Sequence, residues 1–289
     1  MGGVTPFPPS PLPSVPPPLP PALPRLIATD LDGTLLRDDR TVSDRTVAAL
    51  AAAEKAGIDV FFVTGRPSRW MDVVAEHTAG HGIVICANGA GVYDLRHDRL
   101  LSCDPLDAPD AARIAHALRA AVPGTSFAVE RSYSFHREAG YATPWGGVPD
   151  SLIAPIDALL THDADQPLLK LLARHENADP DEFLATALEL LGGQAEVTRS
   201  SSAALLEISR AGVTKATTLA RCCAERGITA AEVVAFGDMP NDLAMLAWAG
   251  TSYAVANAHP AVLAATARHT ATNQDDGVAR VIEALLERG

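Results

Sequence analysis

The sequence predicts an α/β protein in which a doubly wound, mostly parallel sheet is interrupted by an inserted α+β domain. Short apolar runs alternate with helical segments from residue 26 onward, the alternation breaks off near residue 92, and it resumes near residue 211. Strands and helices that alternate in this way build a parallel sheet with helices on both faces. A rhythm that stops and then resumes indicates that a second domain has been inserted into the first.

Local signals give the order of the core elements. Ser43 can cap a helix that Gly57 closes, and Pro67 and Pro240 each suit the first turn of a helix. The expected strands are 26–28, 58–63, 83–86, 233–236 and 252–255. The expected helices are 43–57, one after Pro67, 214–227, one from Pro240 to Gly250, 260–268 and 277–287.

The chain divides into three parts on this reading. Residues 1–24 form a disordered proline-rich tail, residues 25–91 and 211–289 form the core domain, and residues 92–210 form the inserted domain. The elements expected in the insertion are helices at 108–121 and 180–191, with strands near 126–130, 168–173 and 204–208.

The tail is dominated by proline, which lacks an amide donor and fixes its own φ, so an extended, solvated conformation is expected. It contains PxxP spacing, for example Pro8 to Pro11. A docking role and an inert extension therefore both stay open.

The net charge of −12 excludes a general nucleic-acid or anionic-membrane binder, because such proteins present a basic face. No run approaches the about 18 apolar residues of a membrane span, and the N-terminus lacks the pattern of a secretory signal. An anionic small molecule can still bind where positive charge is locally concentrated. The sequence leaves the choice between monomer and homodimer open.

The cysteines and histidines show no metal-ligand spacing. The four cysteines form no C-x-x-C pair and are expected as buried thiols in a reducing, cytoplasmic compartment; they are Cys86, Cys103, Cys222 and Cys223. The nine histidines show no ligand-like clustering, so a zinc site is not expected.

Four short motifs fall where a strand ends or a helix begins: Asp30–Thr34, Thr64-Gly65, Lys215 and 237–242. The first motif could have a purely structural role as an Asp-rich turn. However, ligands of open α/β sheets bind outside the carboxyl ends of the strands, so this topology would bring all four motifs to one crevice. On an extended backbone, Asp30 and Asp32 would also project to the same side.

The residue types in these motifs suit phosphoryl transfer. Asp30, Asp238 and Asp242 supply hard oxygen atoms for magnesium, and a carboxylate such as that of Asp30 can attack phosphorus. Asp32 can give a proton to the leaving alcohol and later take one from water. Three further residues suit the phosphate itself: Gly33 by close backbone approach, Thr64 by its hydroxyl before a helix, and Lys215 by its charge.

The four motifs, in this order, resemble those of the haloacid dehalogenase-like (HAD) hydrolases, and most closely the Cof-type phosphatases, over about residues 25–288. Secondary signatures of that subfamily are resembled at 88–90, 257–258 and 275–278. The resemblance implies a Rossmann-like core with a large α/β cap inserted after the third strand. Met239-Pro240 departs from the family pattern, in which a polar residue usually follows Gly-Asp, but it touches neither acid.

The resemblance also implies the role of each matching residue. Asp30 would be the nucleophile and a Mg²⁺ ligand, Asp32 the general acid/base and a Mg²⁺ ligand through its carbonyl, and Asp238 and Asp242 further metal ligands. The implied phosphate- or substrate-binding residues are Gly33, Thr64, Gly65, Asn88, Lys215 and Asn241.

These observations predict a Mg²⁺-dependent phosphatase that acts on small phosphorylated metabolites, such as sugar phosphates or phosphorylated cofactors, through an aspartyl-phosphate. Two alternatives use the same core: a phosphotransferase or sugar-phosphate mutase, and a non-catalytic phosphate-ligand binder or scaffold. Neither the physiological substrate nor the residues that select it follow from the sequence.

Some polar and aromatic residues allow two interpretations. For Arg66, an ion pair or a role in anchoring its helix is the favoured interpretation over substrate contact. For Trp70, packing is favoured over ligand contact. Asn88 could equally line a pocket or form a tight turn with Gly89. In the insertion, cap structure is the favoured interpretation over reading of the leaving group for Arg131, His136, Arg137, Tyr141 and Trp145.

Overall fold

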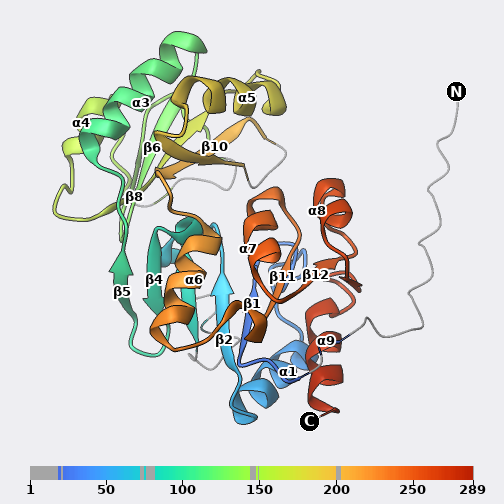
Figure 1. Ribbon diagram of the computed structural model, residues 1–289. Helices are drawn as coiled ribbons and strands as arrows, with labels where there is room; N and C mark the ends of the chain where they lie inside the picture. The colour runs from blue at the N-terminus through green and yellow to red at the C-terminus, as the bar shows by residue number, and fades with distance from the viewer. Residues whose placement is uncertain are drawn as a thin grey trace, which may run out of the picture.

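The computed structural model describes residues 19–20, 22–71, 75, 82–143, 148, 150–199 and 203–288. Most of the predicted tail, the predicted helix after Pro67 beyond its first turn, and Trp145 lie outside these residues. The protein has two layered parts, one above the other (Figure 1). The predicted α/β class with a parallel core sheet and a separate second sheet is confirmed.

The core is an eight-stranded sheet in the order β13-β12-β11-β1-β2-β3-β4-β5. Strand β1 lies between β11 and β2 and is parallel to both, with Ala28 opposite Ala235 and Phe61. The parallel strands are β1 (Leu26–Thr29), β2 (Asp59–Val63), β3 (Ile83–Cys86), β11 (Val233–Gly237), β12 (Thr251–Val255) and β13 (His269–Thr270).

Helices cover both faces of this sheet because successive strand residues point to opposite sides. Ile27 and Phe62 belong to the apolar cluster that includes helices α1 and α9, whereas Ala28 and Phe61 belong to the cluster that includes α6, α7 and α8. The core helices are α1 (Asp44–Lys55), α6 (Lys215–Glu225), α7 (Leu243–Trp248), α8 (Pro260–Ala265) and α9 (Gly277–Leu286), with 3₁₀ turns η1 (Ser68–Trp70), η2 (Ala87–Gly89), η3 (Ala230–Glu232) and η4 (Pro240–Asp242).

An antiparallel hairpin extends the core sheet beyond β3. It consists of β4 (Gly91–Asp94) and β5 (Arg99–Cys103), with β4 paired to β3 so that Val92 lies opposite Ile85. The sequence placed residue 92 onward in the insertion, whereas the structure adds this hairpin to the first sheet. The strands are short, and their apolar pattern resembles that of any half-buried hairpin, so the pattern alone did not assign them to a sheet.

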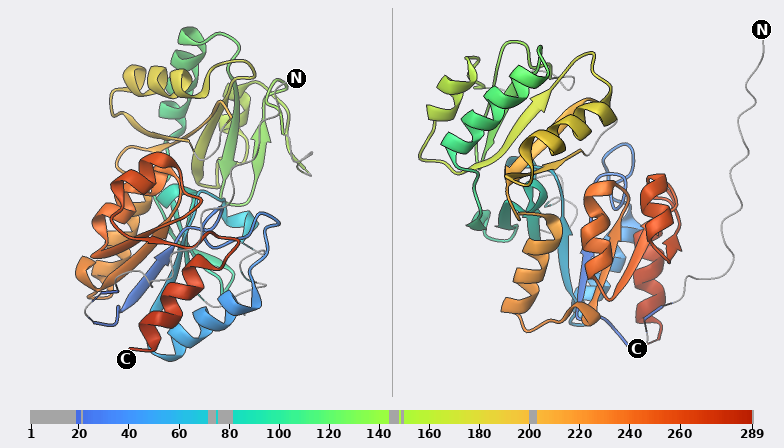
Figure 2. Two further views of the ribbon diagram at one scale, coloured as in Figure 1. Left: turned by 90° about the vertical axis from the view of Figure 1, so that its right-hand side faces the viewer. Right: turned by 45° about the horizontal axis from the view of Figure 1, so that its top comes forward.

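The second part, called the cap below, is a five-stranded antiparallel sheet in the order β7-β6-β8-β10-β9, with helices on one face (Figure 2). Its elements are α3 (Ala108–Ala121), β6 (Ser126–Arg131), β7 (Phe135–Arg137), α4 (Ile156–Thr161), β8 (Leu168–Arg174), α5 (Pro180–Leu191), β9 (Ala195–Thr198) and β10 (Leu205–Arg210). The chain enters the cap after β5 and returns to the core between β10 and α6.

The cap helices match the predicted ranges 108–121 and 180–191, and three of its strands lie at the predicted places. Besides the hairpin strands β4 and β5, four short elements within the described residues were not predicted: β7, β9, β13 and α4. Among the cysteines, Cys86, Cys222 and Cys223 are buried and Cys103 is partly exposed. None of the helices in the described ranges is long and apolar enough to cross a membrane.

The predicted cap of helix α1 gives a test of the fold. The Ser43 hydroxyl accepts a hydrogen bond from the Thr46 amide at 3.1 Å. Replacing it in Ser43→Ala leaves a helix-end amide without its partner, so we expect the free energy of unfolding to fall by about 1 kcal/mol. Urea denaturation measures this, with Ser43→Thr as the matched control that keeps a capping hydroxyl and adds no charge beside Asp276. Equal stability of the alanine variant and wild type would contradict the assigned cap.

Candidate active site

Three adjacent core strands bring the motifs together. Asp30, Thr64 and Asp238 directly follow β1, β2 and β11, which are neighbours in the sheet. Lys215 is the first residue of α6, whose start is capped by Thr214. The carboxyl ends of parallel strands meet at one edge, and in Figure 1 this edge faces the cap.

Lys215 lies between two buried carboxylates. Its Nζ atom is 2.5 Å from Asp30 Oδ1 and 2.6 Å from Asp242 Oδ1. Burial alone would lower the pKa of Lys215, but the charges of Asp242 and Asp30 outweigh it and raise that pKa above its ordinary value. The lysine is therefore a fixed cation that joins residues far apart in the sequence.

The acids of the last motif are held by their own loop. Asp242 Oδ2 accepts hydrogen bonds from the amides of Asp238 and Met239, both at 3.0 Å. Thr34 Oγ1 donates to Asp238 Oδ1 at 2.8 Å, which ties this loop to the first motif. The unusual Met239 thus contributes its backbone to the arrangement, and its presence leaves both acids in place.

Asp30, Asp238 and Asp242 fit a divalent cation. One carboxylate oxygen from each lies within 4.8 Å of the others, and all three residues are buried. Burial raises the pKa of Asp30 well above its ordinary value and, together with the nearby Asp242 charge, raises that of Asp238 to about 6. One ammonium cannot neutralise three carboxylates, so a hard cation such as Mg²⁺ would relieve the remaining repulsion.

Gly33 allows the first motif to turn tightly against Asp238. Its φ of +80° is in the left-handed region, and a Cβ atom there would overlap Asp238 Oδ2. The carbonyl of Leu31 accepts the amides of residues 34, 35 and 36, so the chain turns directly after β1. The argument from an extended backbone therefore fails at Asp30 and Asp32, although both residues line the same cavity.

Asp32 differs from Asp30 in its surroundings. Its side chain is 55% exposed and forms a two-pronged pair with Arg66, whose Nε and Nη2 donate at 2.7 and 2.6 Å. The predicted ion pair of Arg66 is thus present, and its partner is the candidate general acid. The hydrogen bonds that Arg66 donates to Asp32 in turn raise the pKa of Arg66.

Thr64 and Gly65 line the cavity beside Asp30. Thr64 is buried, and its hydroxyl accepts the Arg66 amide at 3.0 Å. The carbonyl of Gly65 accepts from Lys170 Nζ of the cap at 2.6 Å. The predicted phosphate loop is therefore in direct contact with the second domain.

Asn88 connects the cap to the loop of the last motif. Its Nδ2 donates to Glu207 Oε2 at 2.7 Å and to Thr198 Oγ1 at 3.2 Å, and its Oδ1 accepts from Asn241 Nδ2 at 3.2 Å. Asn241 lines the cavity, and its Oδ1 is buried without a hydrogen-bond partner among the described residues. A role for either asparagine in phosphate binding stays a prediction.

The sequence analysis missed a set of buried charges between the domains. Arg69 makes a two-pronged pair with Glu130 at 2.8 and 3.0 Å, and Lys170 Nζ is 2.6 Å from Glu207 Oε2. The signal was available, because Lys170 and Glu207 are single charges within otherwise apolar strand segments, where an unpaired charge is rarely tolerated.

Several cap candidates serve the cap itself. Arg131 donates to the carbonyls of Leu160 and Gln166, and Arg137 to those of Glu138 and Tyr141. These contacts agree with the favoured interpretation as cap structure. Tyr141 of the cap instead lines the cavity, and Trp70 of the core both lines the cavity and packs against the core cluster, as the favoured interpretation expects.

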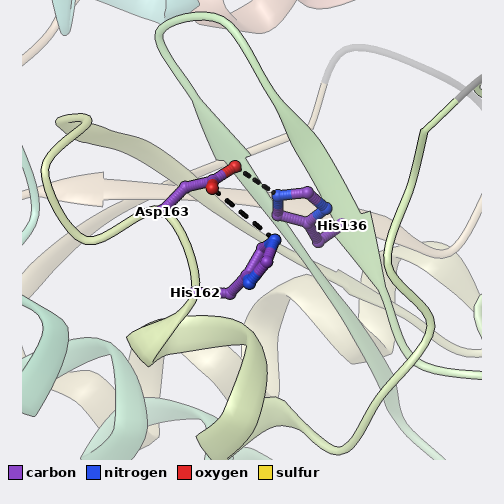
Figure 3. A group of neighbouring side chains, drawn as sticks. All are labelled: His136, His162 and Asp163. Atoms are coloured by element: carbon purple, nitrogen blue, oxygen red, sulfur yellow. Dashed lines mark hydrogen bonds and ion pairs between the residues drawn. The ribbon is translucent and has the colours of Figure 1, made fainter.

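His136 belongs to a cluster with His162 and Asp163 that the fold, but not the sequence spacing, brings together (Figure 3). Its Nε2 is 2.9 Å from Asp163 Oδ2, and its Nδ1 accepts the Leu152 amide at 3.0 Å. An accepting Nδ1 fixes the proton on Nε2, whereas a metal-bound histidine donates through its second nitrogen. Both ring nitrogens are engaged, so the cluster suits cap structure better than a metal.

A cavity of about 790 Å³ lies between the core motifs and the cap. Its size is that of a small-molecule site. The core contributes Asp30, Asp32, Arg40, Thr64, Gly65, Arg66, Pro67, Arg69, Trp70, Met239 and Asn241, and the cap contributes Glu130, Phe135, Tyr141, Lys170, Leu172, Arg174, Ala203, Leu205 and Glu207.

The fold and this site define a class of proteins in which a Rossmann-like α/β core carries a buried acidic cluster at its strand ends, beneath an inserted cap. The sequence profile of the haloacid dehalogenase-like hydrolases matches residues 27–282, and the chain belongs to this family.

Named relatives cover almost the whole chain. A 5-amino-6-(5-phospho-D-ribitylamino)uracil phosphatase of Bacillus subtilis is 28% identical over 275 residues, which are 90% of this chain and 97% of the relative. A pyridoxal phosphate phosphatase of Escherichia coli is 28% identical over 287 residues, covering 91% and 98%. A solved HAD subclass IIB sugar phosphatase shares the fold with a TM-score of 0.74 at 20% identity, covering 90% of this chain and 98% of that chain.

The raised pKa of Asp238 predicts pH-dependent metal binding. Because this carboxyl holds its proton up to about pH 6, protons compete with Mg²⁺ below that value. We expect the apparent Kd for Mg²⁺ to rise by about tenfold per pH unit below pH 6. Calorimetric titration between about pH 7.5 and pH 5 measures this.

Stability without metal should change in the opposite direction. The folded protein binds the proton of Asp238 more tightly than the unfolded chain, in which the pKa is ordinary. The free energy of unfolding should therefore rise as the pH falls from about 6 toward 4 in the presence of a chelator. An Mg²⁺ affinity that stays constant over the same window would contradict the assignment of Asp238.

Proposed function

We propose that this protein is a Mg²⁺-dependent phosphatase that hydrolyses small phosphorylated metabolites through an aspartyl-phosphate on Asp30. The observation that carries the proposal is the placement of Asp30. Its buried carboxylate lines the cavity, accepts a hydrogen bond from Lys215 and lies beside two further acids. Binding alone would need no nucleophile, so this arrangement favours catalysis over a scaffold role.

The first half of the reaction moves the phosphoryl group onto the enzyme. A carboxylate oxygen of Asp30 attacks phosphorus, and the bond from phosphorus to the substrate oxygen breaks. Asp32 gives its proton to that leaving oxygen. Lys215 stabilises the negative charge that gathers on the carboxylates and the phosphoryl oxygens.

The second half removes the phosphoryl group. Asp32 now takes a proton from water, the water oxygen attacks phosphorus, and the bond to Asp30 breaks with release of inorganic phosphate. A divalent cation held by Asp30, Asp238 and Asp242, and by the carbonyl of Asp32 as the family resemblance implies, would supply charge neutralisation on the phosphoryl oxygens. The hydroxyl of Thr64, the amides near Gly33 and Gly65, and the amide of Asn241 are the proposed phosphate contacts, and Asn88 would act on the phosphate through Asn241, from whose Nδ2 it accepts a hydrogen bond at 3.2 Å.

Arg66 must change partners during this cycle. It occupies both oxygens of Asp32, which therefore cannot face a leaving group in this conformation. A phosphate monoester offers Arg66 new anionic oxygens within the same cavity. Substrate binding would thus free Asp32 for proton transfer at the moment when it is needed.

The substrate class follows from the relatives and the cavity. The named relatives act on a phosphorylated ribitylaminouracil and on pyridoxal phosphate, both of which are small heterocyclic phosphate esters. The cavity has space for a molecule of that size. We therefore propose phosphorylated cofactors or their precursors, with sugar phosphates as the neighbouring class.

Asp30→Asn tests the proposed nucleophile. The amide keeps the shape of the side chain but is a far poorer nucleophile, so we expect turnover of p-nitrophenyl phosphate to fall by at least about 10³-fold. Asp110→Asn, an exposed change on α3, is the matched control and should leave activity unchanged. Near-wild-type turnover by Asp30→Asn, or turnover by wild type that a chelator does not reduce, would refute the mechanism.

Product analysis separates hydrolysis from group transfer. Wild type incubated with a sugar monophosphate should release inorganic phosphate. Formation of an isomeric sugar phosphate without free phosphate would instead identify a mutase.

A further inference from the structure

One face of the cap sheet forms the roof of the cavity. Lys170, Leu172 and Arg174 alternate along β8 and all line the cavity, whereas Leu171 and Ala173 point to the opposite face and pack in the cluster with the cap helices. Leu205 and Glu207 of β10 continue the roof in the same way. The chemistry of the roof is therefore set by every second residue of two strands.

The roof has a near end and a far end. Lys170 contacts the Gly65 carbonyl and so lies over the phosphate loop. Arg174 is four residues further along the same strand, which corresponds to about 13 Å of extended chain. Leu172 lies between them and gives the middle of the roof an apolar surface.

The carboxylates of the roof already have partners. Glu130 accepts both hydrogen bonds of Arg69, and Glu207 accepts from Lys170 and Asn88. These acceptors hold the two domains together, so they are not available to a substrate hydroxyl.

Two donors that line the cavity lack such partners in the described part of the chain: Tyr141, and Arg174 at the far end of the roof. Tyr141 is fully buried, lines the cavity and has no hydrogen-bond partner for its hydroxyl among the described residues. Within the same residues, Arg174 makes no side-chain hydrogen bond or ion pair, although its charge acts on Tyr141. Burial keeps the pKa of Tyr141 above its ordinary value, so its hydroxyl is a donor at neutral pH. A buried donor without an acceptor costs about 1–3 kcal/mol, which a correctly placed ligand atom would recover.

We propose that Tyr141 and Arg174 recognise the organic part of the substrate and select phosphate monoesters whose far end carries an electron-rich oxygen acceptor, such as a carbonyl, phenolate or carboxylate oxygen. The inference rests on the proposed phosphatase function of the same cavity. Leu172, Leu205 and the ring of Phe135 contact the body of the leaving group, which favours a flat or apolar moiety over a polyol. A site built from donors discriminates against analogues that lack the acceptor, because its donors then stay unpaired.

A matched pair of substrates tests this selection. Phenyl phosphate and 4-carboxyphenyl phosphate differ in one acceptor group at the end opposite the phosphate. Because the ratio of variant to wild type is taken for each substrate, their different intrinsic reactivities cancel. We expect Tyr141→Phe to lower kcat/KM for the carboxylated substrate by about 5- to 10-fold and Arg174→Gln by about 10- to 100-fold. Tyr141→Phe should change kcat/KM for phenyl phosphate by less than about twofold, and Arg174→Gln should lower it by a smaller factor than for the carboxylated substrate.

Tyr141→Phe is a suitable probe because it keeps the ring, which packs edge-on against Phe135 at a centroid distance of 6.1 Å. Its thermal midpoint should be no lower than that of wild type, because the change removes a buried hydroxyl that has no partner among the described residues. Equal losses on both substrates, or no loss on either, would overturn the proposed recognition.

Binding to an inactive enzyme separates this inference from the proposed function. In Asp30→Asn, calorimetry should show that 4-carboxyphenyl phosphate binds more tightly than phenyl phosphate, and that adding Tyr141→Phe removes about the same factor as in turnover. If wild type hydrolyses neither ester nor p-nitrophenyl phosphate, the phosphatase assignment fails while this measurement still decides the recognition. If Asp30→Asn binds both esters equally well, or binds neither, the recognition fails whatever the activity.

Discussion

The arrangement of the site depends on the Lys215 ammonium, which lies 2.5 Å from Asp30 and 2.6 Å from Asp242. Three carboxylates converge here because β11 and β1 are neighbours in the sheet, and burial removes most of the water that would screen their repulsion. One ammonium leaves the cluster negative, which gives it affinity for a divalent cation. The same negative charge would repel a phosphate ester. A bound cation and the basic residues of the cavity wall would both offset this repulsion.

The cavity wall concentrates positive charge locally, although the whole protein has a net charge of −12. Positive side chains gather around the cavity from both domains: Arg40, Arg66, Arg69, Lys170 and Arg174. Three of them are held by acids of the core motif or the cap, which fixes their positions. The hydrogen bonds from Lys170 to Gly65 and from Asn88 to Glu207 place the roof over the phosphate loop, so the two domains build one binding surface.

The sequence predicted those site residues whose polar side chains stand at a strand end or a helix start, where a ligand site is expected. Asp30, Thr64 and Asp238 could be found because polar residues that directly follow apolar strands have few structural reasons to be there, and Lys215 because it opens a helix after the insertion. The hairpin β4–β5, the pairing of Arg66 with Asp32 and the roof residues could not be placed, because each depends on which distant strands lie side by side. Lys170 and Glu207 stood out only as charges in apolar strands, and the sequence does not show that they pair with each other on neighbouring cap strands or that they contact Gly65 and Asn88 of the core.

The return of the chain from the cap has a mechanical consequence. After β10 ends at Arg210, four residues lead to Lys215, and Gly212 among them has a φ of +76°. At the core end of this linker, the first turns of α6 are attached to the core because Thr218 donates a hydrogen bond to the Gly89 carbonyl at 2.8 Å. A tilt of the cap relative to the core therefore pulls on a short linker that ends at Lys215, the residue that carries the ammonium. Opening of the cap would therefore also weaken the pairing of Lys215 with Asp30 and Asp242. Substrate exchange and the catalytically competent arrangement of the site would then alternate.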